Sequence, residues 1–225
     1  MVKDGNELDG RLSSTSARRP GRPRANESEE RRRAILAAAR QSFVELGFAR
    51  TTTAEVAARA KVSKRAIYEA FTNRTELFAE VIRDCQHLIV DLPRPEDEEL
   101  PLLDTLIRIF RLDLDDDAER AREAMLNLIV RESTLLPELS DYLYENGALR
   151  SREALIEWLL LESARGRISV DDPLVDAGML MDMVFGALLP RRRSTEATDR
   201  MLRRDHIKKR LAIYLRGIGA DPLSG

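Results

Sequence analysis

Basic and hydroxyl-bearing side chains gather at the start of two short segments, near residues 52 and 64. Lys64 and Arg65 open the second segment, and Ala66, Tyr68 and Glu69 follow closely. Ammonium, guanidinium and phenol groups donate hydrogen bonds to phosphate oxygens, and the arginine fork also matches the two acceptors that guanine shows in the major groove. This combination of residue types indicates contact with a nucleic acid, with Arg65 as the first candidate to read a base.

Two short helices joined by a tight turn are predicted to position these side chains. Thr52 with Glu55 forms a capping-box pattern that predicts a helix over 53–60, and Ser63 can cap a second helix over 64–70. The apolar side chains that would hold the pair together are Val56, Ala57, Val62, Ile67 and Phe71. A major groove about 12 Å wide admits one helix, whose N-terminal end faces the bases while the preceding helix braces it. The pattern therefore predicts a helix-turn-helix.

Helical patterns cover most of the remaining chain. Ser28 is predicted to cap a first helix that ends before Gly47, and a regular apolar stripe predicts a long helix over 74–90. A segment with three prolines and several acids, from Asp91 to Pro101, interrupts the pattern. Further helices are expected at 101–112, 117–133, 137–165 with a break near Gly147, 173–189 and 197–217. The sequence thus predicts an all-α protein of about nine helices, with an N-terminal three-helix helix-turn-helix domain and a larger C-terminal helical bundle.

Charge divides the 225-residue chain into two parts. Residues 11–83 hold 16 Lys and Arg against 8 Asp and Glu, a net of +8, whereas residues 84–225 hold 20 against 28, a net of −8. A basic N-terminal third is typical of a module that binds a polyanion. We expect a disordered basic arm at 1–27, a helix-turn-helix domain at 28–73 and a larger domain at 74–225 that begins with a connecting helix over 74–90.

The basic arm contains the run Arg-Pro-Gly-Arg-Pro-Arg at 19–24, which resembles the core of an AT-hook. Arginines spaced by proline and glycine in an extended chain can follow an A·T-rich minor groove, so Arg22 is a candidate minor-groove contact. The alternative is a solubilising tail that attracts phosphate without specificity. Both readings stay open on the sequence alone.

Catalytic and metal-binding patterns receive little support. His87 and His206 lie in separate predicted helices without a partner at metal-ligand spacing, and no glycine-rich phosphate loop or nucleophile elbow is present. We predict no catalytic residue, no metal and no cofactor.

Cys85, the single cysteine, lies on an apolar stripe, which favours a buried inert thiol and leaves a redox-sensing role open. The first thirty residues lack an apolar signal segment and no run of about eighteen apolar residues occurs, so we expect a cytoplasmic protein without a membrane span.

The segment around the two short helices resembles the N-terminal domain of TetR-family transcriptional regulators, over about residues 28–82. The matching residues are Gly47 to Ala57, Val62 to Tyr68, Phe71, Arg74 and Leu77. The resemblance implies a homodimer in which the domain at 74–225 binds a small-molecule effector and dimerises. It further implies a transcriptional repressor that binds a palindromic operator in double-stranded DNA and responds to that effector.

The same resemblance implies which residues contact DNA. Thr52 and Thr53 correspond to backbone-contacting positions, Tyr68 to a phosphate-contacting tyrosine, and Arg74 to a lysine that contacts phosphate. The positions implied to approach bases are Lys64, Arg65 and Ala66. This chain departs from the family pattern at Lys61, where a glycine is usual in the turn, and at Glu69 with Ala70, where an aromatic-histidine pair is more common. Glu69 could accept a hydrogen bond from cytosine or repel phosphate, and neither role is assigned.

The domain at 74–225 contains candidate residues for effector binding and dimerisation but no diagnostic motif for either. Large side chains that could line an effector pocket for an apolar or aromatic compound are Met125, Leu128, Tyr142, Trp158, Met181 and Phe185, although plain core is the more common role for such residues. Apolar faces that could form a four-helix dimer interface comprise Leu180, Val184, Leu188, Leu211, Tyr214 and Leu215, unless they pack only within the chain. The rival functions are a sequence-tolerant architectural DNA-binding protein without an effector and an all-helical enzyme.

Overall fold

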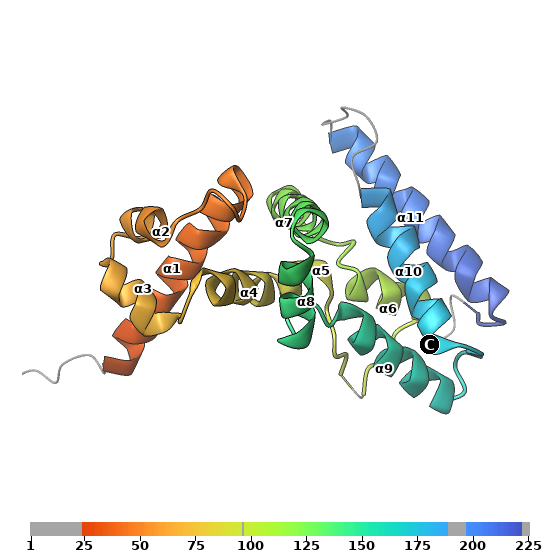
Figure 1. Ribbon diagram of the computed structural model, residues 1–225. Helices are drawn as coiled ribbons and strands as arrows, with labels where there is room; N and C mark the ends of the chain where they lie inside the picture. The colour runs from red at the N-terminus through yellow and green to blue at the C-terminus, as the bar shows by residue number, and fades with distance from the viewer. Residues whose placement is uncertain (1–23, 96, 189–196, 222–225) are drawn as a thin grey trace, which may run out of the picture.

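The computed structural model describes residues 24–95, 97–188 and 197–221, and these residues form helices without any strand (Figure 1). The helices are α1 (Arg24–Leu46), α2 (Thr53–Ala60), α3 (Lys64–Ala70), α4 (Arg74–Asp84), α5 (Gln86–Ile89), α6 (Leu102–Ile109), α7 (Asp116–Leu135), α8 (Pro137–Glu145), α9 (Ser151–Ala164), α10 (Pro173–Leu188) and α11 (Ala197–Gly217). The predicted all-α fold is confirmed.

Two helix boundaries differ from the sequence prediction, and a predicted break near Gly147 is confirmed. Helix α1 begins at Arg24, so Ser28 lies inside the helix instead of capping it, because the preceding residues include the helix formers Arg24 and Ala25 and place Glu27 in the first turn. The predicted 74–90 helix is divided into α4 and α5 at Cys85, whose N–H bonds to the carbonyls of both Val81 and Ile82. The 137–165 segment is divided into α8 and α9 near Gly147, as predicted, and Gly147 has a φ of +70° that suits glycine.

The N-terminal domain packs around an aromatic cluster. Phe78 of α4 is fully buried, and its ring centroid lies 4.9 Å from that of Phe43 on α1 and 5.2 Å from that of Phe48, both in edge-to-face geometry. Such geometry is favoured because the positive ring edge meets the negative ring face. Val56 of α2 and Ile67 of α3 bury their side chains in the same core. These contacts hold α1, α2, α3 and α4 together in one domain core.

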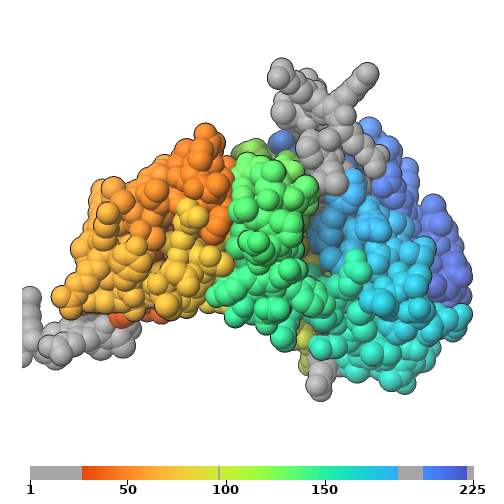
Figure 2. All heavy atoms as spheres, in the orientation of Figure 1, coloured from red at the N-terminus to blue at the C-terminus, as the bar shows by residue number. Residues whose placement is uncertain are grey.

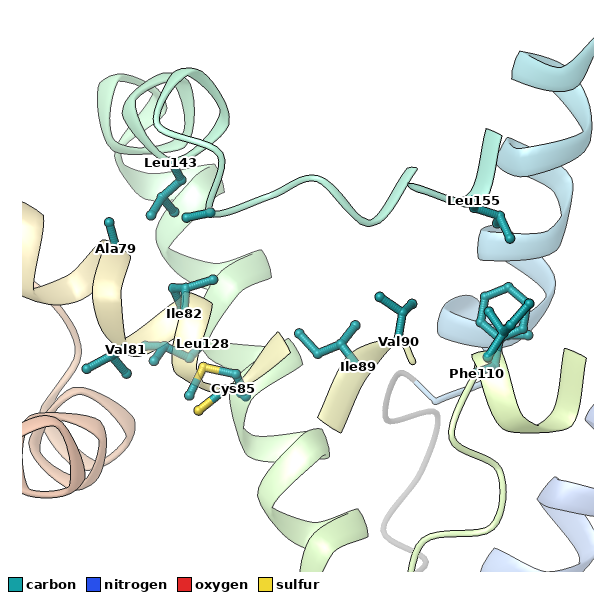
Figure 3. Packing of buried hydrophobic residues seen from close by; sticks show 14 of the residues in the cluster. Ala79, Val81, Ile82, Cys85, Ile89, Val90, Phe110, Leu128, Leu143 and Leu155 are labelled. Atoms are coloured by element: carbon teal, nitrogen blue, oxygen red, sulfur yellow. The ribbon is translucent and has the colours of Figure 1, made fainter. Parts of the chain in front are cut away.

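Helices α4 and α5 carry the core from the N-terminal domain into the larger one (Figure 3). Figure 3 shows Ile82 and Cys85 against Leu128 of α7, and Ile89 and Val90 continuing toward Phe110. The break at Cys85 lets the chain redirect this apolar stripe while every side chain in it remains buried. One continuous apolar core therefore joins the two domains, and Figure 2 shows them as adjoining lobes.

Helix α7 lies between the two domains. Its buried residues Met125 and Leu128 join the shared core, and its C-terminal half reaches α1, where the Arg131 Nη2 donates to the Phe43 carbonyl at 3.5 Å. Gly47, which ends α1 with a φ of +82°, approaches the same place, since a Cβ there would lie 3.0 Å from the Glu132 Oε1. A change in the position of α7 therefore acts directly on the end of α1.

A buried ionic cluster fixes the start of α7. Arg122 is fully buried and its Nη1 donates to the carbonyls of Phe110 at 3.0 Å and Arg111 at 2.8 Å, which holds the turn after α6. The Glu119 carboxylate lies 3.5 Å from Arg122 Nη2 and also pairs with Arg204 of α11. Burial lowers the pKa of Arg122, and Glu119 offsets part of that effect. The cluster joins α6, α7 and α11 through charges that are paired, as buried charges must be.

Candidate nucleic-acid interface

The turn between α2 and α3 is formed by a residue in the left-handed conformation. Lys61 has φ +56° and ψ +40°, and its N–H bonds to the carbonyls at the end of α2. A side chain at this conformation costs about 1 kcal/mol relative to glycine, which explains why the turn usually takes a glycine. The side chain of Lys61 is exposed, so the turn adds a positive charge at the edge of the helix-turn-helix.

Side-chain caps start the helices on either side of this turn. The Thr52 Oγ1 accepts from the Glu55 N–H at 3.2 Å, and the Ser63 Oγ accepts from the Ala66 N–H at 3.1 Å. Asn73 caps α4 in the same way, accepting from the Glu76 N–H at 2.9 Å. These three caps confirm the helix starts predicted from the sequence and set the first turn of α3 in place.

The outward face of α3 carries the predicted DNA-contacting side chains. Ile67 is 1% exposed and locks the inward face, whereas Lys64, Arg65 and Tyr68 are exposed and Ala66 is half-buried. An exposed tyrosine is unusual, and Tyr68 is 56% exposed. The face therefore presents one guanidinium, one ammonium and one phenol to a partner, together with the exposed carboxylate of Glu69.

Helix α2 supplies the hydroxyl groups beside α3. The Thr53 Oγ1 lies 3.2 Å from the Tyr68 hydroxyl, so the two predicted backbone-contacting residues form one polar pair across the helix-turn-helix. Thr52 is exposed, and its Oγ1 is engaged in the α2 cap. The crossing of α2 and α3 thus places Thr53 beside Tyr68, on the helix that also carries Lys64 and Arg65.

Arg74 has a different setting from the one predicted. Its Nη1 donates to the carbonyls of Ala49 at 3.2 Å and Thr51 at 3.0 Å, and its guanidinium lies 4.3 Å from the Phe48 ring centroid. These contacts hold the loop that leads into α2. This role was not predicted, although the segment that resembles the family contains both Phe48 and Arg74. The implied contact of Arg74 with phosphate stays a prediction.

The remaining predicted arm residue, Arg22, lies outside the described residues. Within the described part of the chain, no group of three or more His, Cys, Asp or Glu side chains is arranged to hold a metal ion. No helix among the described residues is long and apolar enough to cross a membrane.

Comparisons with known proteins agree with this geometry. A family model described as bacterial regulatory proteins, tetR family, matches residues 35–81, which contain the whole helix-turn-helix. A second model, described as the C-terminal domain of AefR-like transcriptional repressors, matches residues 106–217. The chain belongs to the TetR family.

Relatives of this TetR-family protein span nearly its full length. It is 25% identical to the uncharacterized HTH-type transcriptional regulator YvkB of Bacillus subtilis (strain 168) over 187 residues, which cover 83% of this chain and 96% of YvkB. A TetR-family transcriptional regulator from Rhodococcus sp. has the same fold, with a TM-score of 0.67 at 22% identity over 83% of this chain and 98% of that one. The flavonoid-responsive regulator FrrA is 26% identical, with a TM-score of 0.57 over 84% of this chain and 97% of FrrA.

The side chains predicted to line an effector pocket differ in burial in this TetR-family protein, and their role in binding an effector stays a prediction. Met125, Leu128 and Trp158 are buried, while Tyr142, Met181 and Phe185 are half-buried. Phe185 lines a cavity of about 200 Å³ between α7 and α10, together with Leu126, Asn127 and Val130. Met125 instead borders a cleft of about 580 Å³ between α1, α2 and α7. The helix α7 therefore borders both spaces.

Of the predicted dimer-interface side chains, the five that the structure describes are buried within the subunit. Leu180, Val184, Leu211 and Leu215 are no more than 1% exposed, and the Tyr214 hydroxyl donates to Asp176 at 2.8 Å. The described residues thus favour the alternative that these faces pack within one subunit. Helix α10 packs against α9 and α11, and α11 also packs against α6, so these apolar side chains are used inside the chain. The side chain of Leu188 lies outside the description. The opposite face of the pair exposes Leu174, Val175 and Met179 on α10, and Met201, Leu202 and Ile213 on α11.

The Cys85 thiol is expected to be unreactive in the folded protein. Cys85 is fully buried, and burial raises the pKa of its thiol, an effect that the nearby Arg40 guanidinium only partly offsets. Because the thiolate is the nucleophile, a disulfide reagent at about pH 8 should label Cys85 only after guanidinium chloride unfolds the chain. Rapid labelling of the native protein would contradict this burial.

The same shift has a consequence for stability. A thiol whose pKa is raised by folding contributes stability that is present below the pKa of the unfolded thiol, about 8.5, and is lost as pH rises through the folded-state value. The free energy of unfolding should therefore fall more steeply with alkaline pH in the wild type than in a Cys85→Ser variant.

Proposed function

We propose that this TetR-family transcriptional regulator represses its target by binding a palindromic operator through α3 of two subunits. The observation that carries the proposal is the outward face of α3, where Lys64, Arg65 and Tyr68 are exposed around a core locked by Ile67. The N-terminal end of such a helix enters the major groove, so Lys64, Arg65 and Ala66 would approach base edges. Thr52, Thr53 and Tyr68 would contact the phosphate backbone beside them.

Selection of bound fragments from the source genome by the purified protein tests the proposal. The regulator account expects a palindrome whose half-sites are centred about one helical turn of DNA apart. The recovery of unrelated A·T-rich fragments, bound equally well, would instead support the architectural alternative. An enzyme would show turnover that survives the loss of Arg65 and Tyr68.

The homodimer is proposed to form through the exposed face of α10 and α11. These helices lie side by side at the end of the molecule far from α3 (Figure 1), and their outward face carries apolar side chains such as Val175, Met179 and Ile213. An apolar surface of this kind marks a protein interface in a soluble protein. A two-fold axis through this face would relate the α3 helices of the two subunits, so that each helix could bind one half of a palindrome.

Replacing Met179 with glutamate should separate the subunits, because the substitution places a charge in the proposed interface. We expect sedimentation velocity to change from dimer to monomer and the operator affinity to fall about 100-fold, since each subunit then binds one half-site alone. Leu135→Glu is the matched control, since Leu135 on α7 is also exposed and lies outside this face. A Met179→Glu protein that remains a dimer would refute the proposed interface.

The effector is proposed to bind in the cavity between α7 and α10. Its wall combines Leu126, Val130 and the Phe185 ring with the polar groups of Asn127 and Asp182, as ligand sites combine apolar walls with a few orienting polar groups. Helix α7 continues from this cavity to the Arg131 contact with α1, so an effector that moves α7 would change the position of the DNA-binding domain. The similarity to FrrA makes a flavonoid the first effector class to test.

A melting-temperature measurement with the flavonoid naringenin checks the effector proposal. Wild type should melt a few degrees higher in saturating ligand, because binding to the folded state stabilises it. Phe185→Ala should lose this rise, whereas Tyr144→Ala, which removes an exposed aromatic ring on α8, should keep it. An unchanged rise in Phe185→Ala would exclude this cavity, and no rise in wild type would exclude the flavonoid.

A further inference from the structure

Glu69 is an unexpected residue on a surface that should face phosphates. Its side chain is 55% exposed on α3, one helical turn after Arg65, whose side chain is 87% exposed. A carboxylate beside DNA repels the phosphate backbone, so its presence on the recognition helix weakens binding unless it also makes a favourable interaction. The residue pattern alone left open whether it reads cytosine or only repels phosphate.

The structure gives Glu69 a single partner on the same helix. The Arg65 Nε donates to the Glu69 Oε1 at 2.8 Å, and this bond raises the pKa of Arg65. Positions 65 and 69 are related by the i,i+4 spacing that places side chains next to each other on a helix. The pairing therefore follows from the sequence spacing and requires no contact from another element.

The bond to Nε restricts how Arg65 can recognise a base. A guanidinium has five N–H donors in a rigid fork, and it can offer guanine either its side edge, formed by Nε and one Nη, or its terminal edge, formed by Nη1 and Nη2. With Nε donating to Glu69, the terminal edge is the pair that remains for the two guanine acceptors, O6 and N7.

We propose that Glu69 is a specificity-determining positioning residue, which holds Arg65 so that its terminal edge reads guanine and which repels the phosphates of other sequences. The inference rests on the proposed function, because it requires α3 to lie in the major groove. It predicts that Glu69 increases the ratio of operator binding to non-specific binding, whereas a merely structural residue would change both by the same factor. Glu69 acts through Arg65 and does not itself need to touch a base.

The experiment is a double-mutant cycle on DNA. Arg65→Ala, Glu69→Gln and the double variant are titrated against the genomically selected duplex, a duplex with the contacted G·C pair changed to A·T, and a scrambled duplex. We expect Glu69→Gln to lower discrimination against the changed base pair by about threefold to tenfold. Affinity for scrambled DNA should rise, because the substitution removes the negative charge that repels phosphates. In the Arg65→Ala background, Glu69→Gln should leave the discrimination unchanged.

The Glu69→Asp variant separates the effect of the negative charge at position 69 from the effect of the hydrogen bond to Arg65. Aspartate keeps the negative charge but is one methylene shorter, so it should lose discrimination as Glu69→Gln does, while affinity for scrambled DNA stays low. Melting temperatures of all variants should match wild type, because the pair is exposed and distant from the core.

The outcomes distinguish this inference from the function on which it rests. If Arg65→Ala leaves operator affinity unchanged, base reading by α3 fails and the proposed function fails with it. If Arg65→Ala weakens binding but Glu69→Gln costs the same discrimination with or without Arg65, Glu69 reads a base directly and the positioning role is overturned. If Glu69→Gln changes operator and scrambled binding equally, Glu69 has no part in specificity.

Discussion

Arg65→Ala should lower the affinity of the dimer for the selected operator by at least about 30-fold, since the contact is lost in both half-sites, while the affinity for scrambled DNA changes far less. The reason is that a bidentate arginine-guanine pair contributes about 1–3 kcal/mol of base discrimination per half-site, and Arg65 is the exposed guanidinium on the outward face of α3. Fluorescence anisotropy titrations at one fixed salt concentration measure both affinities.

Tyr68→Phe serves as the control for this prediction. It removes only the hydroxyl that lies 3.2 Å from Thr53 Oγ1, so operator and scrambled DNA should both bind more weakly by a similar factor, as expected for a phosphate contact. A loss in Arg65→Ala that is equal for both duplexes would instead make Arg65 a phosphate contact. In that case, the bases are read by another residue.

Phe78→Ala should destabilise the protein by about 3–5 kcal/mol, since it removes a fully buried ring and leaves a cavity. The lost ring contacts Phe43 and Phe48 edge to face, so the cluster that fixes α1 against α4 is lost with it. Chemical denaturation measures the change in the free energy of unfolding. Operator affinity should also fall among the molecules that remain folded, because α4 then holds the helix-turn-helix less firmly.

Phe78→Leu tests the packing argument, because it retains apolar volume and should cost clearly less than alanine. Phe110→Ala provides a matched control in the larger domain, where the ring is equally buried and lies 5.8 Å from the Phe185 ring. That variant should be destabilised to a similar extent, yet its folded fraction should bind the operator normally. Equal loss of operator affinity in both variants would show that stability alone determines the effect of Phe78.

Local patterns were enough to predict the DNA-binding domain. The caps at Thr52, Ser63 and Asn73 depend on neighbours three residues away, and the inward position of Ile67 follows from helical periodicity. The φ of +56° at Lys61 fits the family resemblance, in which a glycine is usual at this turn. Such features are decided within a few residues of the chain.

Long-range packing could not be predicted in this way. The stripe of Leu180 and Val184 is apolar whether it meets a second subunit or the chain's own α11, and only the fold shows that it is already buried. The two contacts of Arg74 with carbonyls before α2 join residues 23 and 25 positions apart, so spacing gave no sign of them. The same holds for Arg122, whose buried guanidinium depends on the turn after α6 and on α11 through Glu119.

Sequence reading by α3 is best measured as the ratio of operator affinity to scrambled-DNA affinity for the wild-type protein at two salt concentrations. A regulator that reads sequence should bind the selected duplex at least about 1,000-fold more tightly than a scrambled duplex of the same composition. Both affinities should also fall as salt rises, because phosphate contacts contribute to each. A ratio near one at both salt concentrations would contradict sequence reading by α3 and leave a protein that binds DNA only through its charge.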